Sequence, residues 1–149
     1  MSSIDASSST SAQPRSVDWG RYALIAIGTV IAAVAANLVV YVIGSAVVGY
    51  DPGFVVLATP GGTIIFTLVP AVVAVVVYAL LLRFASNPER TFAILAAVVL
   101  VLSWIPDLTY IPTVPGSSTA QTVVLMIMHV VAAVVIVGML TNLARPRTG

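Results

Sequence analysis

Residues 22–48 read YALIAIGTVIAAVAANLVVYVIGSAVV and contain no charged side chain. A membrane-spanning helix needs about 20 consecutive, mainly apolar residues, so this stretch is long enough to cross a bilayer. Three further apolar stretches follow at residues 63–84, 91–111 and 119–143. The fold class that these stretches predict is all-α, an integral membrane four-helix bundle.

The third stretch is the shortest, because Pro106 and Asp107 interrupt its apolar sequence. A helix over residues 91–105 would rise by about 22 Å, whereas the hydrocarbon core of a bilayer is about 30 Å thick. Either the helix continues through Pro106 to about Ile111, or irregular backbone that protein or water shields completes the crossing.

The overall composition supports a membrane protein. Of 149 residues, 60% are hydrophobic and 7% are charged, and the chain has no cysteine and one histidine. Soluble domains carry about 25% charged residues, so the composition excludes an ordinary soluble enzyme. The net charge of +1 provides no long-range attraction for nucleic acid. Thiolate metal sites and histidine-rich metal sites are excluded as well, and we expect neither a metal nor a cofactor.

The N-terminal segment differs from the rest of the chain. Residues 1–18 include seven serines and few large apolar side chains, a composition typical of disordered segments. We therefore divide the chain into a disordered, serine-rich cytoplasmic tail at 1–18 and a four-helix transmembrane domain at 19–145.

The arginines indicate how the helices are oriented. All six lie before the first apolar stretch, between the second and third, or after the fourth: Arg15, Arg21, Arg83, Arg90, Arg145 and Arg147. Because basic residues concentrate on the cytoplasmic side of membranes, we predict a multi-pass protein of the cell membrane with both termini cytoplasmic (N-in, C-in). The apolar run Phe54–Leu57, in an outer connection, is expected to lie among lipid headgroups or to pack over the bundle.

Polar residues within the apolar stretches fall at one depth. Asn37, Thr67 and His129 each lie 16 residues from an arginine, which corresponds to about 24 Å along a helix. Ser103 and Asp107 bracket the same depth, and we expect Asp107 to be hydrated near the outer surface. Tyr41 lies one turn beyond Asn37 on the same helix face. The candidate polar pocket therefore consists of Asn37, Tyr41, Thr67, Ser103, Asp107 and His129.

This polar layer has two interpretations. Such side chains often bond across helices only to hold a bundle together, or they line a pocket for a small molecule, a lipid, an ion or a proton. Ser103, Asp107 and His129 are the residue types of a hydrolytic triad, but the sequence around Ser103 has no nucleophile-elbow motif. We therefore expect no catalytic residue and no enzyme.

The function that the sequence favours is that of a non-enzymatic accessory or interaction protein. Its expected partners are membrane lipids and either a second copy or another membrane protein, because Gly28, Ala32 and Ala36 form a small-residue stripe suited to helix packing. The alternative is binding or transport of a small molecule, lipid, ion or proton through the polar pocket.

Several short motifs resemble a known family. They are Asn37 with Tyr41, Pro70, the connection from Arg83 to Arg90-Thr91-Phe92, Leu102-Ser103 before Pro106, and Met128-His129 before Ala132-Ala133. Over about residues 20–143 the chain resembles a domain-of-unknown-function family of small four-helix prokaryotic integral membrane proteins. The resemblance implies a four-helix membrane domain and brings no activity with it.

Overall fold

The computed structural model describes residues 17–144, which form four long helices, one 3-10 turn and no strand. The elements are α1 (Trp19–Val48), α2 (Pro60–Phe84), α3 (Pro88–Thr109), the 3-10 turn η1 (Ile111–Thr113) and α4 (Thr119–Leu143). Most of the predicted serine-rich tail, together with Arg15, Arg145 and Arg147, lies outside the described residues.

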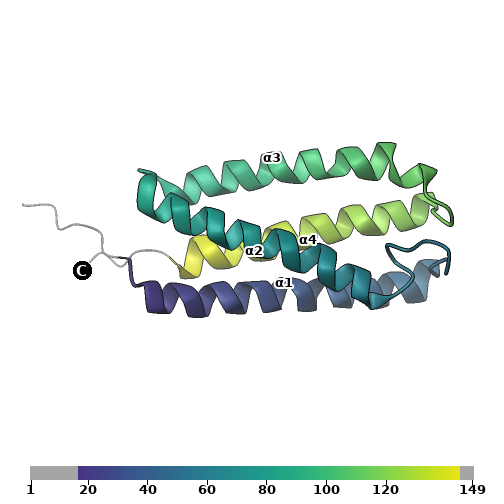
Figure 1. Ribbon diagram of the computed structural model, residues 1–149, viewed down its shortest axis with the longest axis horizontal. Coiled ribbons are helices and arrows are strands. Elements are labelled where there is room, and N and C mark those ends of the chain that lie inside the picture. The colour runs from purple at the N-terminus through teal and green to yellow at the C-terminus, as the bar shows by residue number, and fades with distance from the viewer. Residues whose placement is uncertain (1–16, 145–149) are drawn as a thin grey trace, which may run out of the picture.

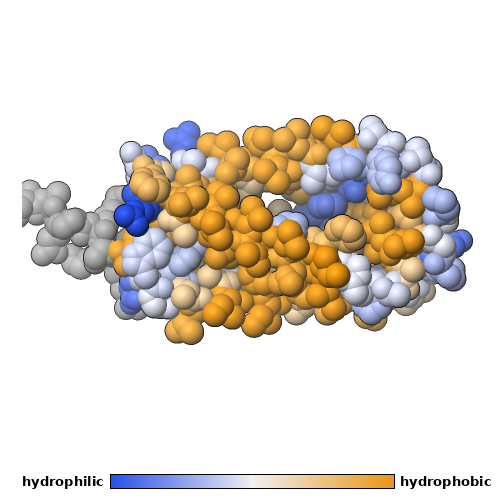
Figure 2. Space-filling view, viewed as in Figure 1, coloured by the Kyte–Doolittle hydropathy of each residue, from blue (hydrophilic) through white to orange (hydrophobic). Residues whose placement is uncertain are grey.

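The four helices form one elongated bundle (Figure 1), and all are long and apolar enough to cross a membrane. Helix α1 contacts α2 and α4, and α3 contacts α2 and α4. Apolar residues cover most of the middle of the face seen in Figure 2, whereas hydrophilic residues gather toward its two ends. The prediction of an all-α, four-helix membrane fold is confirmed.

The helix starts follow from local sequence. The Asp18 side chain accepts a hydrogen bond from the Arg21 backbone N–H (3.0 Å) at the start of α1, and Ser118 caps α4 in the same way. Helices α2 and α3 begin at Pro60 and Pro88, and proline is favoured there because the first turn of a helix leaves its N–H groups unpaired.

Helix α3 continues through Pro106 and ends at Thr109. Its length of 22 residues corresponds to about 33 Å, enough to cross the hydrocarbon core. The Tyr110 N–H then donates to the Pro106 carbonyl (2.9 Å), and η1 follows. Of the two alternatives for the third crossing, the structure therefore has the continuous helix.

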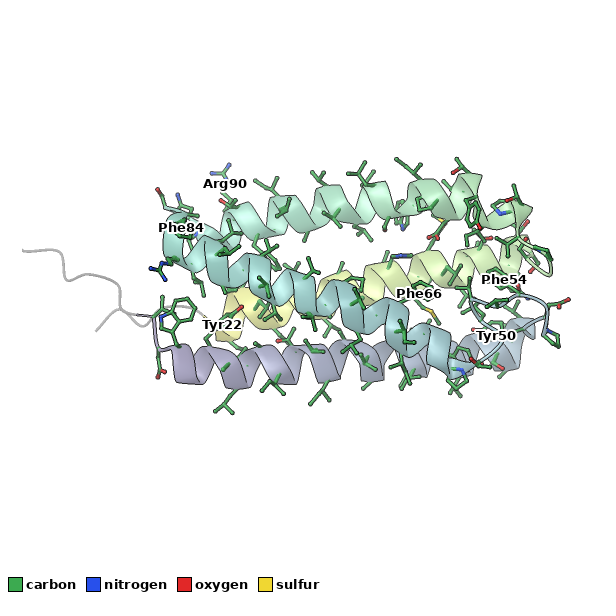
Figure 3. The ribbon with its side chains drawn as sticks, viewed as in Figure 1. Tyr22, Tyr50, Phe54, Phe66, Phe84 and Arg90 are labelled. Carbon is green, nitrogen blue, oxygen red and sulfur yellow. The ribbon has the colours of Figure 1, made fainter. Side chains whose placement is uncertain are left out.

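One end of the bundle, the arginine end, contains Arg21, Arg83 and Arg90. The Arg21 guanidinium donates to the Leu143 carbonyl (2.8 Å), which joins the start of α1 to the end of α4. Figure 3 shows Arg90 and Phe84 at this end and Tyr50 and Phe54 at the opposite end.

The opposite end is closed by the loop cap, which consists of residues 49–59 and 110–118. Phe54 and Leu57 are fully buried there, in a cluster with Ile111, Val124 and Met128. Of the two positions expected for the run 54–57, the structure has it packed over the bundle.

A buried glutamine joins the two loops of the cap. In the amide orientation that satisfies both partners, Gln121 donates to the Gly116 carbonyl (3.1 Å) and accepts from the Asp51 N–H (3.0 Å). Gly116 itself has a φ of 75°, and a Cβ atom there would lie 2.7 Å from the Phe54 backbone nitrogen. The close packing of the loop cap therefore requires glycine at this position.

Replacing Gly116 by alanine is expected to lower the free energy of unfolding by at least about 1–2 kcal/mol, because the left-handed backbone disfavours a side chain and the new methyl group meets Phe54. The matched control is Gly138→Ala in α4, because a Cβ atom at Gly138 has no atom within 4 Å. The control should leave stability unchanged or raise it by up to about 1 kcal/mol. Thermal unfolding in detergent micelles measures both, and equal melting temperatures would contradict the account of the cap.

We predict that the arginine end faces the cytoplasm. The chain has no cysteine, so a single introduced thiol reports which side of the membrane it lies on. Thr59→Cys, in the loop cap, should react with a membrane-impermeant maleimide in intact cells. Ser86→Cys, in the α2–α3 connection, should react only after the cells are permeabilised. The reverse pattern would overturn the predicted orientation.

Candidate functional site

A cavity of about 490 Å³ lies beside α2 and α3 and is also lined by residues of α1 and α4. Its walls on α2 and α3 are mainly apolar and include Val69, Val73, Leu95 and Val99, whose side chains are also partly exposed on the outside of the bundle. The space-filling view shows the molecule hollowed between α2 and α3, with hydrophilic residues inside the hollow (Figure 2). The cavity therefore opens sideways, where the membrane would surround the protein.

The paths of the helices account for this opening. Helix α2 runs obliquely, approaching α3 at the arginine end and α1 at the loop cap (Figure 1), so α2 and α3 diverge toward the cap. Phe92 lines the arginine end of the cavity and packs against the fully buried Tyr78, with ring centroids 4.9 Å apart. Leu57 of the loop cap lines the other end. Protein thus covers both ends of the cavity.

Asn37 and Thr67 hold α1 and α2 together at the cavity. The Asn37 side-chain amide donates to the Thr67 hydroxyl (2.9 Å), and only 3% of Asn37 and 5% of Thr67 are exposed. Two buried oxygens at the same cavity have no hydrogen-bond partner: Asn37 Oδ1 and Thr63 Oγ1. Both oxygens have almost no accessible surface, so they lie within the packed wall and not on the open surface of the cavity.

His129 lines the cavity from α4 and lies next to Asp107 of α3. Its Nδ1 atom is 2.9 Å from the Leu125 carbonyl oxygen and 3.2 Å from Asp107 Oδ2. Because a carbonyl can only accept, we assign the proton to Nδ1, which leaves Nε2 as an acceptor when the ring is neutral. The carboxylate is close enough for an electrostatic contact, although Oδ2 forms no hydrogen bond.

Asp107 itself is buried, with 7% of its side chain exposed. The expectation that it is hydrated at the surface was therefore wrong. The reason is that α3 continues for a further turn past Pro106, which places Asp107 against α4 instead of in the connecting loop.

Ser103 and Tyr41 have other surroundings. Ser103 lines the cavity, but its hydroxyl donates to the Leu100 carbonyl (2.7 Å) of its own helix. Tyr41 packs against Tyr50, with ring centroids 5.1 Å apart, and the Tyr50 hydroxyl donates to the Tyr41 carbonyl (3.1 Å). Burial raises the pKa of the Tyr50 hydroxyl.

Four of the six candidate residues line the cavity: Asn37, Thr67, Ser103 and His129. Asp107 lies next to His129, and Tyr41 packs against Tyr50 beneath the loop cap.

Residues 17–146 match the family described as "Family of unknown function (DUF6069)". The chain belongs to this family. No curated protein and no solved structure matches this chain. The family resemblance seen in the sequence is confirmed.

One residue of the candidate site, Thr63, was not predicted from the sequence. Thr63 lies four residues before Thr67 and so on the same face of α2, and this spacing is the signal that could have identified it. Across residues 17–144, no group of three or more His, Cys, Asp and Glu side chains gathers in a way that could hold a metal ion.

Replacing Thr67 by valine removes the acceptor of the Asn37 amide without changing the side chain's shape. Hydrogen bonds between membrane helices contribute about 0.6–2 kcal/mol, and we expect a loss in that range in the free energy of unfolding. Thr29→Val is the matched control, because fully buried Thr29 bonds only to the Ile25 carbonyl of its own helix (2.8 Å). Unfolding in mixed detergent micelles measures both variants. An equal loss in the control would show that the Asn37–Thr67 bond adds nothing specific.

Proposed function

We propose that this protein is a non-enzymatic membrane protein that binds a hydrophobic or amphiphilic molecule, which enters from the bilayer between α2 and α3. The observation that carries the proposal is the cavity of about 490 Å³, with apolar walls and a cluster of polar groups. Its volume falls within the range of about 300–1,000 Å³ found for ligand pockets, which combine mainly apolar walls with a few polar groups.

The open side of the cavity argues that it is occupied in a membrane. Its partly exposed apolar residues on α2 and α3 would face the bilayer, so a hydrocarbon chain can enter and contact the walls. Left empty, the walls would lose those contacts. A cavity of this shape is therefore expected to hold a chain-bearing molecule.

The direction of entry follows from what surrounds the cavity. The loop cap covers one end and the Phe92–Tyr78 contact lies at the other, whereas the side between α2 and α3 has partly exposed apolar residues. A membrane-dissolved molecule can reach this side directly. Toward the arginine end, the lining consists of apolar residues such as Val77, Ile136 and Val137. This lining supports binding over transport of an ion or proton across the membrane.

The surroundings of Ser103 support a non-enzymatic role. A serine nucleophile requires a base that accepts its proton, but the Ser103 hydroxyl donates to the Leu100 carbonyl. His129 directs Nδ1 toward the Leu125 carbonyl and Asp107. The three residue types of a hydrolytic triad therefore do not form the relay that such a triad needs.

An accessory role through self-association stays a prediction. A Cβ atom at Gly28 would meet no atom within 4 Å, so α1 keeps open space at this position that another helix can approach. With the cytoplasmic orientation proposed for the arginine end, the polar part of the cavity lies in the outer half of the cell membrane.

Filling the cavity should abolish binding. Ala96 of α3 lines the cavity, whereas its neighbour Ala97 is exposed and lies outside the lining. We expect saturable photolabelling of α2 and α3 by a diazirine-bearing hexadecyl probe, lost in Ala96→Phe and kept in Ala97→Phe. Labelling of the outer, lipid-facing surface should stay proportional to probe concentration in all three proteins. If labelling never saturates, or if both variants behave alike, the proposal is wrong.

A further inference from the structure

We infer that the head group of the ligand is a carboxylic acid, which binds in the cavity at Nε2 of His129. The inference rests on the proposed binding function and names the chemical class of ligand for the same site. The His129 side chain lines the cavity and is 40% exposed. The other polar side chains of the lining are buried (Asn37, Thr63 and Thr67) or donate within their own helix (Ser103).

The contacts of His129 determine what its free nitrogen can do. Nδ1 lies 2.9 Å from the Leu125 carbonyl oxygen, so the proton of the neutral ring is on Nδ1 and Nε2 is an acceptor. Nε2 has no hydrogen-bond partner among residues 17–144 and is not buried. A head group that reaches Nε2 from the cavity must therefore donate a hydrogen bond to it.

Asp107 makes the ring a good acceptor of a proton. Its Oδ2 atom lies 3.2 Å from Nδ1 of His129, and only 7% of its side chain is exposed. In surroundings of low dielectric constant, a carboxylate at this distance strongly stabilises an imidazolium. The lining itself adds no competing charge, because none of its described residues is Arg, Asp or Glu. Asp107 is therefore the counter-charge that a protonated His129 would have.

A carboxylic acid uses both properties of the ring. It enters as a neutral molecule, donates a hydrogen bond to Nε2 and passes the proton to it. The O–H bond breaks, an N–H bond forms at Nε2, and the electron pair stays on the ligand oxygen. The total charge does not change in this step, and the resulting charge-assisted hydrogen bond is about twice as strong as a neutral one. An alcohol can donate to Nε2 but does not give up its proton.

The rest of the cavity accommodates the chain of such an acid. From His129, the lining continues along α4 to the apolar residues Ile136 and Val137, and Phe92 of α3 lines the arginine end. The eight residues from His129 to Val137 correspond to about 12 Å along the helix. The head group therefore lies toward the loop cap and the chain extends toward the arginine end, where a longer chain can leave between α2 and α3.

The first test compares three diazirine-bearing hexadecyl probes with different head groups: a carboxylic acid, an alcohol and an amine. Each is titrated against the full-length protein in phosphatidylcholine nanodiscs at neutral pH, and labelled peptides of α2 and α3 are quantified. The acid should half-saturate at about a three- to tenfold lower concentration than the alcohol, the difference between a charge-assisted and a neutral hydrogen bond. The amine should bind more weakly than both, because its ammonium form would enter an apolar site whose lining excludes Asp107.

The second test observes the ring directly. His129 is the only histidine of the chain, so ¹⁵N-labelled histidine gives the NMR signals of one ring. At a pH at which the ligand-free ring is neutral, its two nitrogens have widely different shifts. Hexadecanoic acid should make the two shifts similar, because both nitrogens are then protonated, whereas hexadecanol should leave them different. A purely structural His129 would respond to neither.

Asp107→Asn tests the counter-charge, because it keeps the size of the side chain and removes its charge. The preference for the acid over the alcohol should fall to less than about twofold, and the ring should stay neutral with hexadecanoic acid. Thr109→Val is the control on the same helix, because its hydroxyl donates to the Ile105 carbonyl (2.7 Å) and it lies outside the lining. It should keep the full preference. If Asp107→Asn does not fold, the NMR experiment on the unchanged protein decides alone.

The inference is overturned if the alcohol or the amine binds as tightly as the acid, because the head-group class is then wrong although the cavity binds ligands. It is also overturned if the ring stays neutral at saturating hexadecanoic acid, or if the preference for the acid survives in a folded Asp107→Asn variant. If no probe labels saturably, the proposed binding function fails together with the inference.

Discussion

A polar side chain inside the hydrocarbon region has no water to bond, so its partner must come from the protein or from a bound molecule. The bond between Asn37 and Thr67 (2.9 Å) satisfies this constraint within the protein and joins α1 to α2. Helix α2 approaches α1 near the loop cap and α3 at the arginine end (Figure 1). The gap between α2 and α3, and with it the cavity, is a consequence of this oblique path.

The same constraint is only partly satisfied at the cavity. Asn37 Oδ1 and Thr63 Oγ1 have no partner, whereas His129 lies against both Leu125 and Asp107. A bundle held together only by polar contacts would be expected to pair its buried oxygens within the protein. The cavity beside them has the volume, the mainly apolar walls and the few polar side chains of a ligand pocket. The cavity therefore favours ligand binding over a purely structural role for the polar layer.

Much of the fold could be predicted because a membrane imposes simple rules. Uninterrupted apolar stretches such as residues 22–48 had to be helices, since the hydrocarbon region leaves few other backbone structures available. Counting residues from the arginines placed Asn37 and Thr67 at one depth, and their hydrogen bond confirms that they meet. The depth of a residue in the membrane does not determine the direction in which its side chain points, however. Each step of four residues turns a helix by about 40°, and Tyr41, one step beyond Asn37, packs against Tyr50 instead of lining the cavity.

Other parts of the site depend on tertiary packing that no local pattern encodes. Whether α3 would pass Pro106 was open from the sequence, and its continuation is what buries Asp107 beside His129. The buried positions of Phe54 and Leu57 depend on Gln121 and Gly116 holding the two loops of the cap together. The cavity arises from the angle between α2 and α3, which single-helix patterns of apolar residues do not determine.

The most direct test of the account is an experimental structure of the protein in lipid nanodiscs, obtained by electron cryomicroscopy with a bound antibody fragment. The account predicts that α2 and α3 stay apart and that elongated density lies between them, within the cavity. A structure in which α2 and α3 pack together along their length, with no density between them, would contradict it.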